Sequence, residues 1–273
     1  MSFSVDQVCQ QFGLSRQAYY KRQTASLSDL FREQLILDEV RAIRCRQPMI
    51  GVRKLHKMVT PTLRAQGIKI GRDQLFALLR RHDLLIAFRK RYVRTTNSYH
   101  RFRTYHNLIR GLAITGPHQV LVSDITYIDT VEGFCYLALI TDAYSRKIVG
   151  YAISQSLSIE FCLEALQQAL TGVANPAQLI HHSDRGIQYC SHAYVALLQQ
   201  HQVNISMTEQ NHVYENALAE RVNGILKTEF LLGEKLISFA VAKELVKQAI
   251  KIYNEERPHM SIAYLTPQLK HAA

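Results

Sequence analysis

Residues 120–153 read VLVSDITYIDTVEGFCYLALITDAYSRKIVGYAI and contain three apolar runs separated by two polar turns. The runs are rich in β-branched and aromatic residues, which favour strands, and they lie at 120–128, 134–141 and 148–153. The stretch therefore predicts a three-stranded meander. Its middle run is nearly all apolar, which is typical of a strand buried in the centre of a sheet.

Strand and helix patterns alternate after this meander. We expect strands around 178–182 and 204–207, and helices at about 158–172, 192–200, 216–232 and 239–255. This order predicts an α/β domain over 113–273, in which helices cover a sheet.

The chain has 273 residues, 47% of them apolar, which is enough for a sizeable core and excludes wholesale disorder. No apolar run approaches the ~18 residues of a membrane span, and no secretion signal precedes the first helix pattern, so we expect a cytoplasmic protein without membrane contact. Five cysteines without a C-x-x-C pair predict reduced thiols and no structural zinc.

The formal net charge of +11 is unevenly distributed along the chain. Residues 1–110 carry +15 and residues 111–273 carry −4. A basic first half indicates a polyanionic partner, but charge alone does not distinguish DNA from RNA or a membrane surface.

The first 30 residues predict a helix-turn-helix. Apolar residues recur at helical spacing over 5–12, Gly13 interrupts them, and Ser15 can cap a second helix over 16–22. Such a second helix can present Arg16, Gln17 and Lys21 to a major groove. An ordinary helical hairpin remains the alternative.

A second helical DNA-binding domain is expected over 31–88. An apolar helical stripe over 35–43 ends before Pro48, a short helix from 52 ends before Pro61, and a third helix covers 72–81. Its leucines are core candidates, whereas its basic residues are candidate DNA contacts: Arg53, Lys54 and Arg72.

Residues 89–112 read as a basic linker with interleaved aromatic rings. Arg89, Lys90 and Arg91 begin it, and their charges can neutralise phosphates. Rings such as Phe102 and Tyr105 can stack on bases. A solvated linker that contacts nothing is the alternative.

Three acidic residues of the second half stand out. Asp124 lies inside an apolar strand, where a carboxylate is costly unless it is paired or bound to metal. Asp184 follows the 178–182 strand, and Glu220 lies on the 216–232 helix. Carboxylates from strand ends and a helix suit Mg²⁺, and two such ions can support in-line phosphoryl transfer.

The helix of Glu220 carries a polar stripe. Asn216, Glu220, Asn223 and Lys227 are spaced by four, three and four residues, so they share one face. We take the two asparagines and the lysine as candidate DNA contacts, with a solvated helix face as the alternative. For Arg257 and His259, a DNA contact and a structural turn both stay open.

The spacing of the three acids is informative, since 59 residues separate the first two and 35 separate the last two. With the blocks around them, the chain resembles the D-D-35-E transposases of the second-frame (OrfB) type from bacterial insertion sequences. These blocks are 123–128, 182–189, 206–207, 215–220, 226–229, 253–259 and 265–267. Departures from the family pattern occur at Ile187, at 208–214 and at Glu215.

The resemblance implies a ribonuclease-H-like mixed sheet flanked by helices, with an integrase-like catalytic core, preceded by the all-α helix-turn-helix region. It implies that Asp124, Asp184 and Glu220 are catalytic and hold two Mg²⁺ ions, with Mn²⁺ as a substitute. The activity would be cleavage of element ends followed by strand transfer into target DNA.

The implied partners are double-stranded DNA (the terminal inverted repeats and the target), further copies of the chain and the upstream-frame (OrfA) protein, with action at the bacterial nucleoid. Two other functions stay open: a DNA-binding regulator that keeps only the fold, and an RNA hydrolase of the ribonuclease H type. The helix-turn-helix patterns count against the second.

Overall fold

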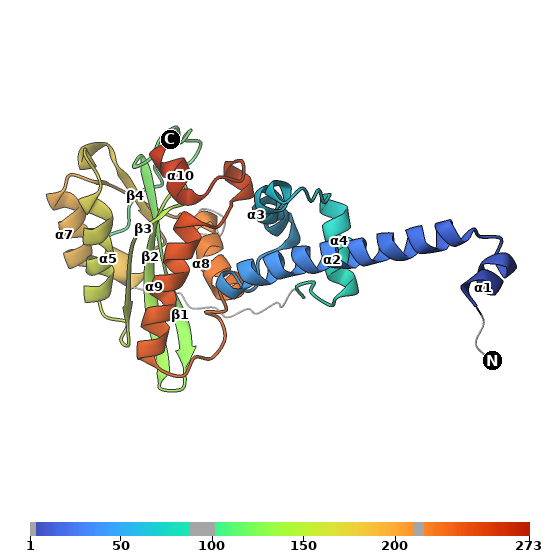
Figure 1. The fold of residues 1–273 in the computed structure, drawn as a ribbon. Helices are drawn as coiled ribbons and strands as arrows, with labels where there is room; N and C mark the ends of the chain where they lie inside the picture. Colours follow the sequence, from blue (N-terminus) through green and yellow to red (C-terminus); the bar gives the residue numbers. More distant parts are fainter. Residues whose placement is uncertain (1–3, 88–101, 210–215) are drawn as a thin grey trace. The chain divides into compact units, whose positions relative to one another are not determined.

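The computed structural model describes residues 4–87, 102–209 and 216–273, without the side chains of 22–26. The chain forms two compact units, drawn together in Figure 1. One holds Met1–Arg46 and Gly51–Ile86, and we call it the helical unit; the other, which we call the sheet unit, holds Gln47–Ile50 and Ala87–Ala273. None of the described helices is both long and apolar enough to cross a membrane.

The helical unit begins with the expected helix, turn and capped helix. α1 covers Val5–Gln11, and Gly13 turns the chain with φ of 63°, a conformation that glycine adopts without strain. α2 starts at Arg16, and the hydroxyl of Ser15 accepts a hydrogen bond from the Ala18 amide at 3.1 Å.

α2 differs from the prediction because it is one helix, Arg16–Arg46, and contains both the 16–22 and the 35–43 patterns. The domain boundary expected after residue 30 therefore falls inside a helix. The stretch contains neither proline nor glycine, so nothing in its backbone chemistry ends the helix earlier.

The helix from residue 52 is longer than predicted. α3 covers Val52–Ala65 and continues through Pro61, although proline removes one backbone donor. Leu55, Val59 and Leu63 lie on one buried face of this helix, and their burial holds the final turn in place. α4 covers Arg72–Arg81 as predicted, with its three leucines buried.

The sheet unit is built on a five-stranded mixed sheet with the order β3-β2-β1-β4-β5. The first three strands form the predicted antiparallel meander, while β4 and β5 run parallel to β1. The strands are β1 Val120–Thr130, β2 Gly133–Asp142, β3 Ile148–Ser154, β4 Ile180–Ser183 and β5 Asn204–Met207.

Helices cover both faces of this sheet (Figure 1). One face packs against α5 Glu160–Thr171, α6 Ile187–Cys190 and α7 His192–Gln200. The other face packs against α8 Ala217–Glu229 and α9 Phe239–Glu255. The remaining elements are α10 Pro267–Ala272 and two 3₁₀ turns, Pro176–Gln178 and Met260–Ile262. The fold class expected from the sequence is confirmed.

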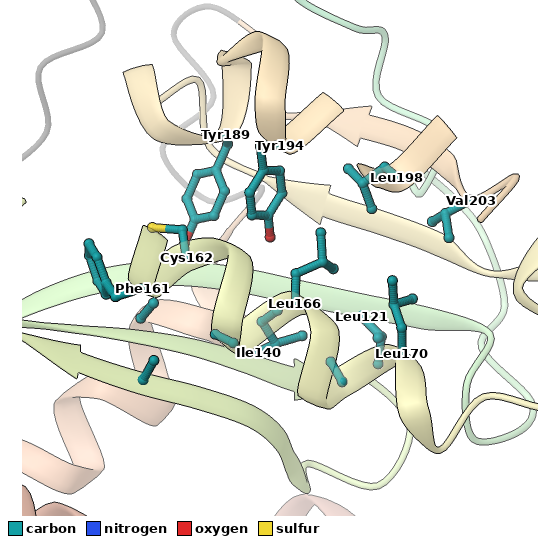
Figure 2. Packing of buried hydrophobic residues seen from close by; sticks show 14 of the residues in the cluster. Leu121, Ile140, Phe161, Cys162, Leu166, Leu170, Tyr189, Tyr194, Leu198 and Val203 are labelled. Atoms are coloured by element: carbon teal, nitrogen blue, oxygen red, sulfur yellow. The ribbon is translucent and has the colours of Figure 1, made fainter. Parts of the chain in front are cut away.

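Successive side chains of β2 point to opposite faces of the sheet, so this strand contributes to the cores on both faces. Ala138 and Ile140 belong to the cluster under α5 and α7, whereas Leu137 and Leu139 belong to the cluster under α8 and α9. Figure 2 shows the first cluster, in which side chains of α5 and α7 meet those of the sheet. Gly150 on β3 lets α5 approach the sheet closely, since a Cβ there would lie 2.1 Å from the Ala165 carbonyl oxygen.

Part of the linker expected over 89–112 packs against the sheet. Arg89, Lys90 and Arg91 lie outside the described residues. Phe102 and Tyr105 are half-buried against the sheet cluster, and Phe102 packs edge-on against His192. Part of each ring therefore covers apolar surface of the sheet unit, and stacking of these two rings on bases stays a prediction.

Candidate active site

Strand register brings the two aspartates together. β1 and β4 pair in parallel, and their last paired residues are Ser123 and Ser183. Asp124 is the next residue of β1, and Asp184 is the first residue after β4, so the two lie side by side at the same end of the paired segment. Neighbouring strands lie about 4.8 Å apart, which makes these carboxyl groups neighbours although 59 residues separate them.

Helix α8 brings Glu220 to the same place. Two asparagines of this segment hold the helix against β1: Asn216 donates from Nδ2 to the Ser123 carbonyl at 3.1 Å, and Asn223 donates from Nδ2 to Oδ2 of Asp124 at 2.7 Å. Glu220 lies in the first turn of α8, between these two anchors.

The three acids influence one another electrostatically. Burial, together with the charges of Asp184 and Glu220, raises the pKa of Asp124 to about 7 against the opposing effect of the Asn223 hydrogen bond. Burial and the charge of Asp184 also raise the pKa of Glu220. The side chains therefore share one site whose negative charge is incompletely compensated.

A cation lies beside this site. The Lys227 ammonium sits 3.9 Å from the ring centroid of Tyr127, three residues after Asp124 on β1. Burial lowers the pKa of Lys227, while the charge of Asp124 opposes that change. In the polar stripe predicted on this helix, Asn223 and Lys227 thus both face β1.

The donor set suits a hard divalent cation, although the side chains are not gathered into a complete ligand shell. Within the described part of the chain, no three His, Cys, Asp or Glu side chains come close enough to hold one ion. Carboxylate oxygens of Asp124, Asp184 and Glu220 are nevertheless the ligands that Mg²⁺ prefers. Oδ1 of Asn223 is buried beside them without a hydrogen-bond partner, and it adds a further oxygen of the same kind.

Burial corrects two of the predicted DNA contacts. Asn216 and Asn223 are 3% and 5% exposed, and both donate a hydrogen bond from Nδ2 to β1. A polar stripe on a helix does not reveal whether it faces solvent or a neighbouring strand, and here it faces a strand. Lys227 is half-buried.

The basic candidates of the helical unit lie on its surface. Arg16, Gln17, Lys21, Arg53 and Arg72 are exposed, and Lys54 is half-buried. Two of them form exposed ion pairs, Arg16 with Asp6 at 3.5 Å and Arg72 with Asp73 at 2.8 Å. Such pairs are weak and open at little cost when a phosphate competes.

Arg257, which the sequence left open, has a structural role. It is 3% exposed and forms a bidentate ion pair with Glu229 at the end of α8, with N–O distances of 2.8 and 2.9 Å. His259 packs edge-on against Tyr253.

A further buried group was not predicted. Nε2 of His181 on β4 lies 2.7 Å from the hydroxyl of Ser123, the residue before Asp124, and 3.0 Å from the Tyr194 hydroxyl. Burial lowers the pKa of His181 to about 3, so the ring is neutral and ties β1, β4 and α7 together. Only the pairing of β1 with β4 reveals this contact.

Comparison with known proteins agrees with this geometry. Two integrase core domain models match residues 114–212 and 201–267. An uncharacterized 31 kDa protein of insertion element IS600 from Shigella sonnei is 37% identical over 265 residues, 95% of this chain and 96% of that protein. Transposase InsF of insertion sequence IS3A from Escherichia coli strain K12 is 31% identical over 272 residues, covering 97% and 93%.

This chain belongs to the IS3 family of transposases. The family, the transposase function and the enzyme class expected from the sequence motifs are thereby confirmed. Among solved structures, a chain of the simian T-cell lymphotropic virus intasome, in complex with a PP2A regulatory subunit, superposes with a TM-score of 0.51. It covers 82% of this chain and 75% of that one at 17% identity, which supports the fold.

Proposed function

We propose that Asp124, Asp184 and Glu220 are the catalytic carboxylates of this IS3-family transposase and that they hold divalent metal, two Mg²⁺ ions in the full site. The register that ends on Ser123 and Ser183 carries the assignment, because it makes the two aspartates neighbours in the fold. Asn223 supports it by tying the helix of Glu220 to Asp124 itself.

The chemistry supplied by bound metal is activation of a water or 3′-hydroxyl and stabilisation of the leaving oxygen at a phosphodiester. Asp124 presents its anionic oxygens from strand β1, and Asp184 presents its own from the residue directly after β4. Asn223 fixes the rotamer of Asp124, so that the carboxylate does not turn away when the site is empty of substrate. Lys227, restrained by the Tyr127 ring, offers a positive charge to a DNA phosphate beside the acids.

Polar and basic surface residues of the helical unit bind the DNA in this proposal. One segment of DNA would be contacted by Arg16, Gln17 and Lys21. A second segment would be contacted by Arg53, Lys54 and Arg72. Arg89, Lys90 and Arg91 complete the basic set in sequence. The substrates are the ends of the element and a target duplex, and the upstream-frame (OrfA) protein is the proposed partner.

The test is an end-joining assay with duplexes taken from the DNA that flanks the gene, run with and without the upstream-frame protein and with Mg²⁺ or Mn²⁺. Asp124→Asn, Asp184→Asn and Glu220→Gln should each abolish cleavage and joining while binding of the same duplexes persists. Asp129→Asn, on the same strand as Asp124, is the matched control and should remain active.

Joined product from any of the three variants at the wild-type rate would refute the assignment of that residue. A wild-type chain that binds the ends but never joins them, with the partner and metal present, would instead identify the DNA-binding regulator. Hydrolysis restricted to RNA–DNA hybrids would identify the RNA hydrolase.

A further inference from the structure

The β1–β2 hairpin carries an aromatic pair next to the carboxylate site. Pairing of β1 with β4 ends at Ser123, and β1 continues to Thr130 with β2 as its antiparallel neighbour (Figure 1). On this extension the rings of Tyr127 and Phe134 meet edge to face, with centroids 5.3 Å apart and planes at 82°. The two residues are diagonal neighbours in the strand register, so both side chains lie on one face of the hairpin.

The two rings differ in exposure. Tyr127 is half-buried and contacts the Lys227 ammonium as well as Phe134, whereas Phe134 is 56% exposed. The inner ring is thus fixed by its neighbours, and the outer ring offers an open aromatic surface of set orientation. A single exposed apolar side chain is ordinary on a protein surface, so its place beside the carboxylates decides what it can bind.

The rings lie within reach of a DNA strand bound at the acids. Tyr127 follows Asp124 by three residues of strand, which corresponds to about 10 Å. Stacked nucleotides of one strand rise about 3.4 Å each, so the rings lie about three nucleotides from a phosphodiester held at the carboxylates. Lys227 joins the two places, since the charge of Asp124 acts on its ammonium while the ammonium contacts the Tyr127 ring.

The charges around the rings favour an uncharged part of the DNA at Phe134. Asp129 lies directly opposite Phe134 in the β1–β2 register, so its carboxylate is on the same face of the hairpin. A phosphate at Phe134 would be repelled by this carboxylate, whereas Lys227 attracts a phosphate nearer the acids. The flat face of a nucleobase carries no net charge and stacks on aromatic rings. The surroundings therefore suit a base on Phe134 and a phosphate at Lys227.

We propose that Phe134, oriented by Tyr127, stacks on an unpaired base of the DNA end, about three nucleotides from the phosphodiester that is cleaved. A base inside a duplex is covered by its neighbours and held by its pairing partner, so this base leaves the helix when the end enters the site. Its stacking fixes the path of the strand between Phe134 and Lys227. This assignment rests on the proposed function, which puts the cleaved phosphodiester at the carboxylates.

The test is a thermodynamic cycle between the ring and the base. The full chain and its Phe134→Leu variant are bound, in EDTA, to the duplexes of the end-joining assay, and Kd is measured by fluorescence anisotropy. Leucine keeps an exposed apolar side chain at this position but has no ring for stacking. Each terminal position of the duplex is tested in three forms: paired, mismatched and abasic.

The ratio of the variant's Kd to the wild-type Kd should depend on the form of one position. With a mismatch there, the base is already unpaired, and we expect a ratio of about 5- to 150-fold. With a paired base the ratio should be smaller, because unpairing offsets part of the stacking. With an abasic site the ratio should be about one, since nothing is left to stack.

Two further variants complete the test. Phe134→Trp keeps a ring and should bind all three forms at least as tightly as the wild type does. Val131→Ala is the matched control, because Val131 is 70% exposed on the same hairpin and has no ring, and its ratio should be about one throughout.

A Phe134→Leu ratio that is the same for the three forms at every position would overturn the proposal, since the ring would then act on something other than a base. Binding of Phe134→Trp as weak as that of Phe134→Leu would overturn it as well. Failure of the carboxylate assignment shows in the joining assay and failure of base stacking in these binding ratios, so the two are distinguishable.

Discussion

Replacing Asp124 by asparagine should stabilise the metal-free protein at high pH. The pKa of this carboxyl is raised from its ordinary 3.8 to about 7, mainly by burial and by the charge of Asp184. A carboxyl whose pKa is higher in the folded chain contributes stability when protonated, below about pH 4, and loses that contribution as the pH rises through 7. Asparagine keeps the shape and the contact with Asn223 but carries no charge to be lost.

The size of the effect follows from the difference between the two pKa values. About three pH units correspond to ~4 kcal/mol, and because Asp124 keeps some contact with solvent we expect about half of this, ~2 kcal/mol. For a unit of this size that amounts to about 4–8 °C in Tm. Asp124→Asn should thus melt higher than the wild type at pH 8 in EDTA, and the difference should fall to about half at pH 4.5.

The assay is thermal unfolding followed by circular dichroism or calorimetry, with Asp129→Asn as the control on the same strand. Added Mg²⁺ should raise the Tm of the wild type at pH 8 and leave Asp124→Asn unchanged, since bound metal compensates the charge that the variant lacks. A gain that is the same at pH 4.5 and pH 8, or one that Asp129→Asn shares, would refute the account of an uncompensated carboxylate cluster.

Three further substitutions test the surroundings of the site. Arg257→Ala leaves the carboxylate of Glu229 without its bidentate partner, so we expect a loss of about 3–5 kcal/mol in urea unfolding, and a loss below 1 kcal/mol would contradict the buried pair. Gly150→Ala drives a methyl group into the α5 backbone and should cost about 1–3 kcal/mol in the same measurement; an unchanged midpoint would show that α5 lies further from the sheet. Asn223→Ala should weaken Mg²⁺ binding in calorimetry by releasing Asp124, without loss of DNA binding, whereas unchanged metal affinity would exclude a positioning role.

Local patterns in the sequence determine much of this protein. The spacing of apolar residues, the turn residues and the helix caps act over only a few residues of the chain. They are sufficient to predict the strands of the meander, the α7 and β5 segments and the start of α2 after Ser15. The spacing of Asp124, Asp184 and Glu220 also lies in the sequence, and together with the matched blocks around these acids it indicates the family.

Only the tertiary structure decided which polar residues meet. The pairing of Ser123 with Ser183 makes two distant aspartates neighbours, and the position of α8 on β1 turns Asn216 and Asn223 from candidate DNA contacts into internal anchors. Helical period gives the face on which a residue lies but not what packs against that face. The reason is physical: partners far apart in sequence are selected by burial and register in the assembled sheet, and no local pattern records that choice.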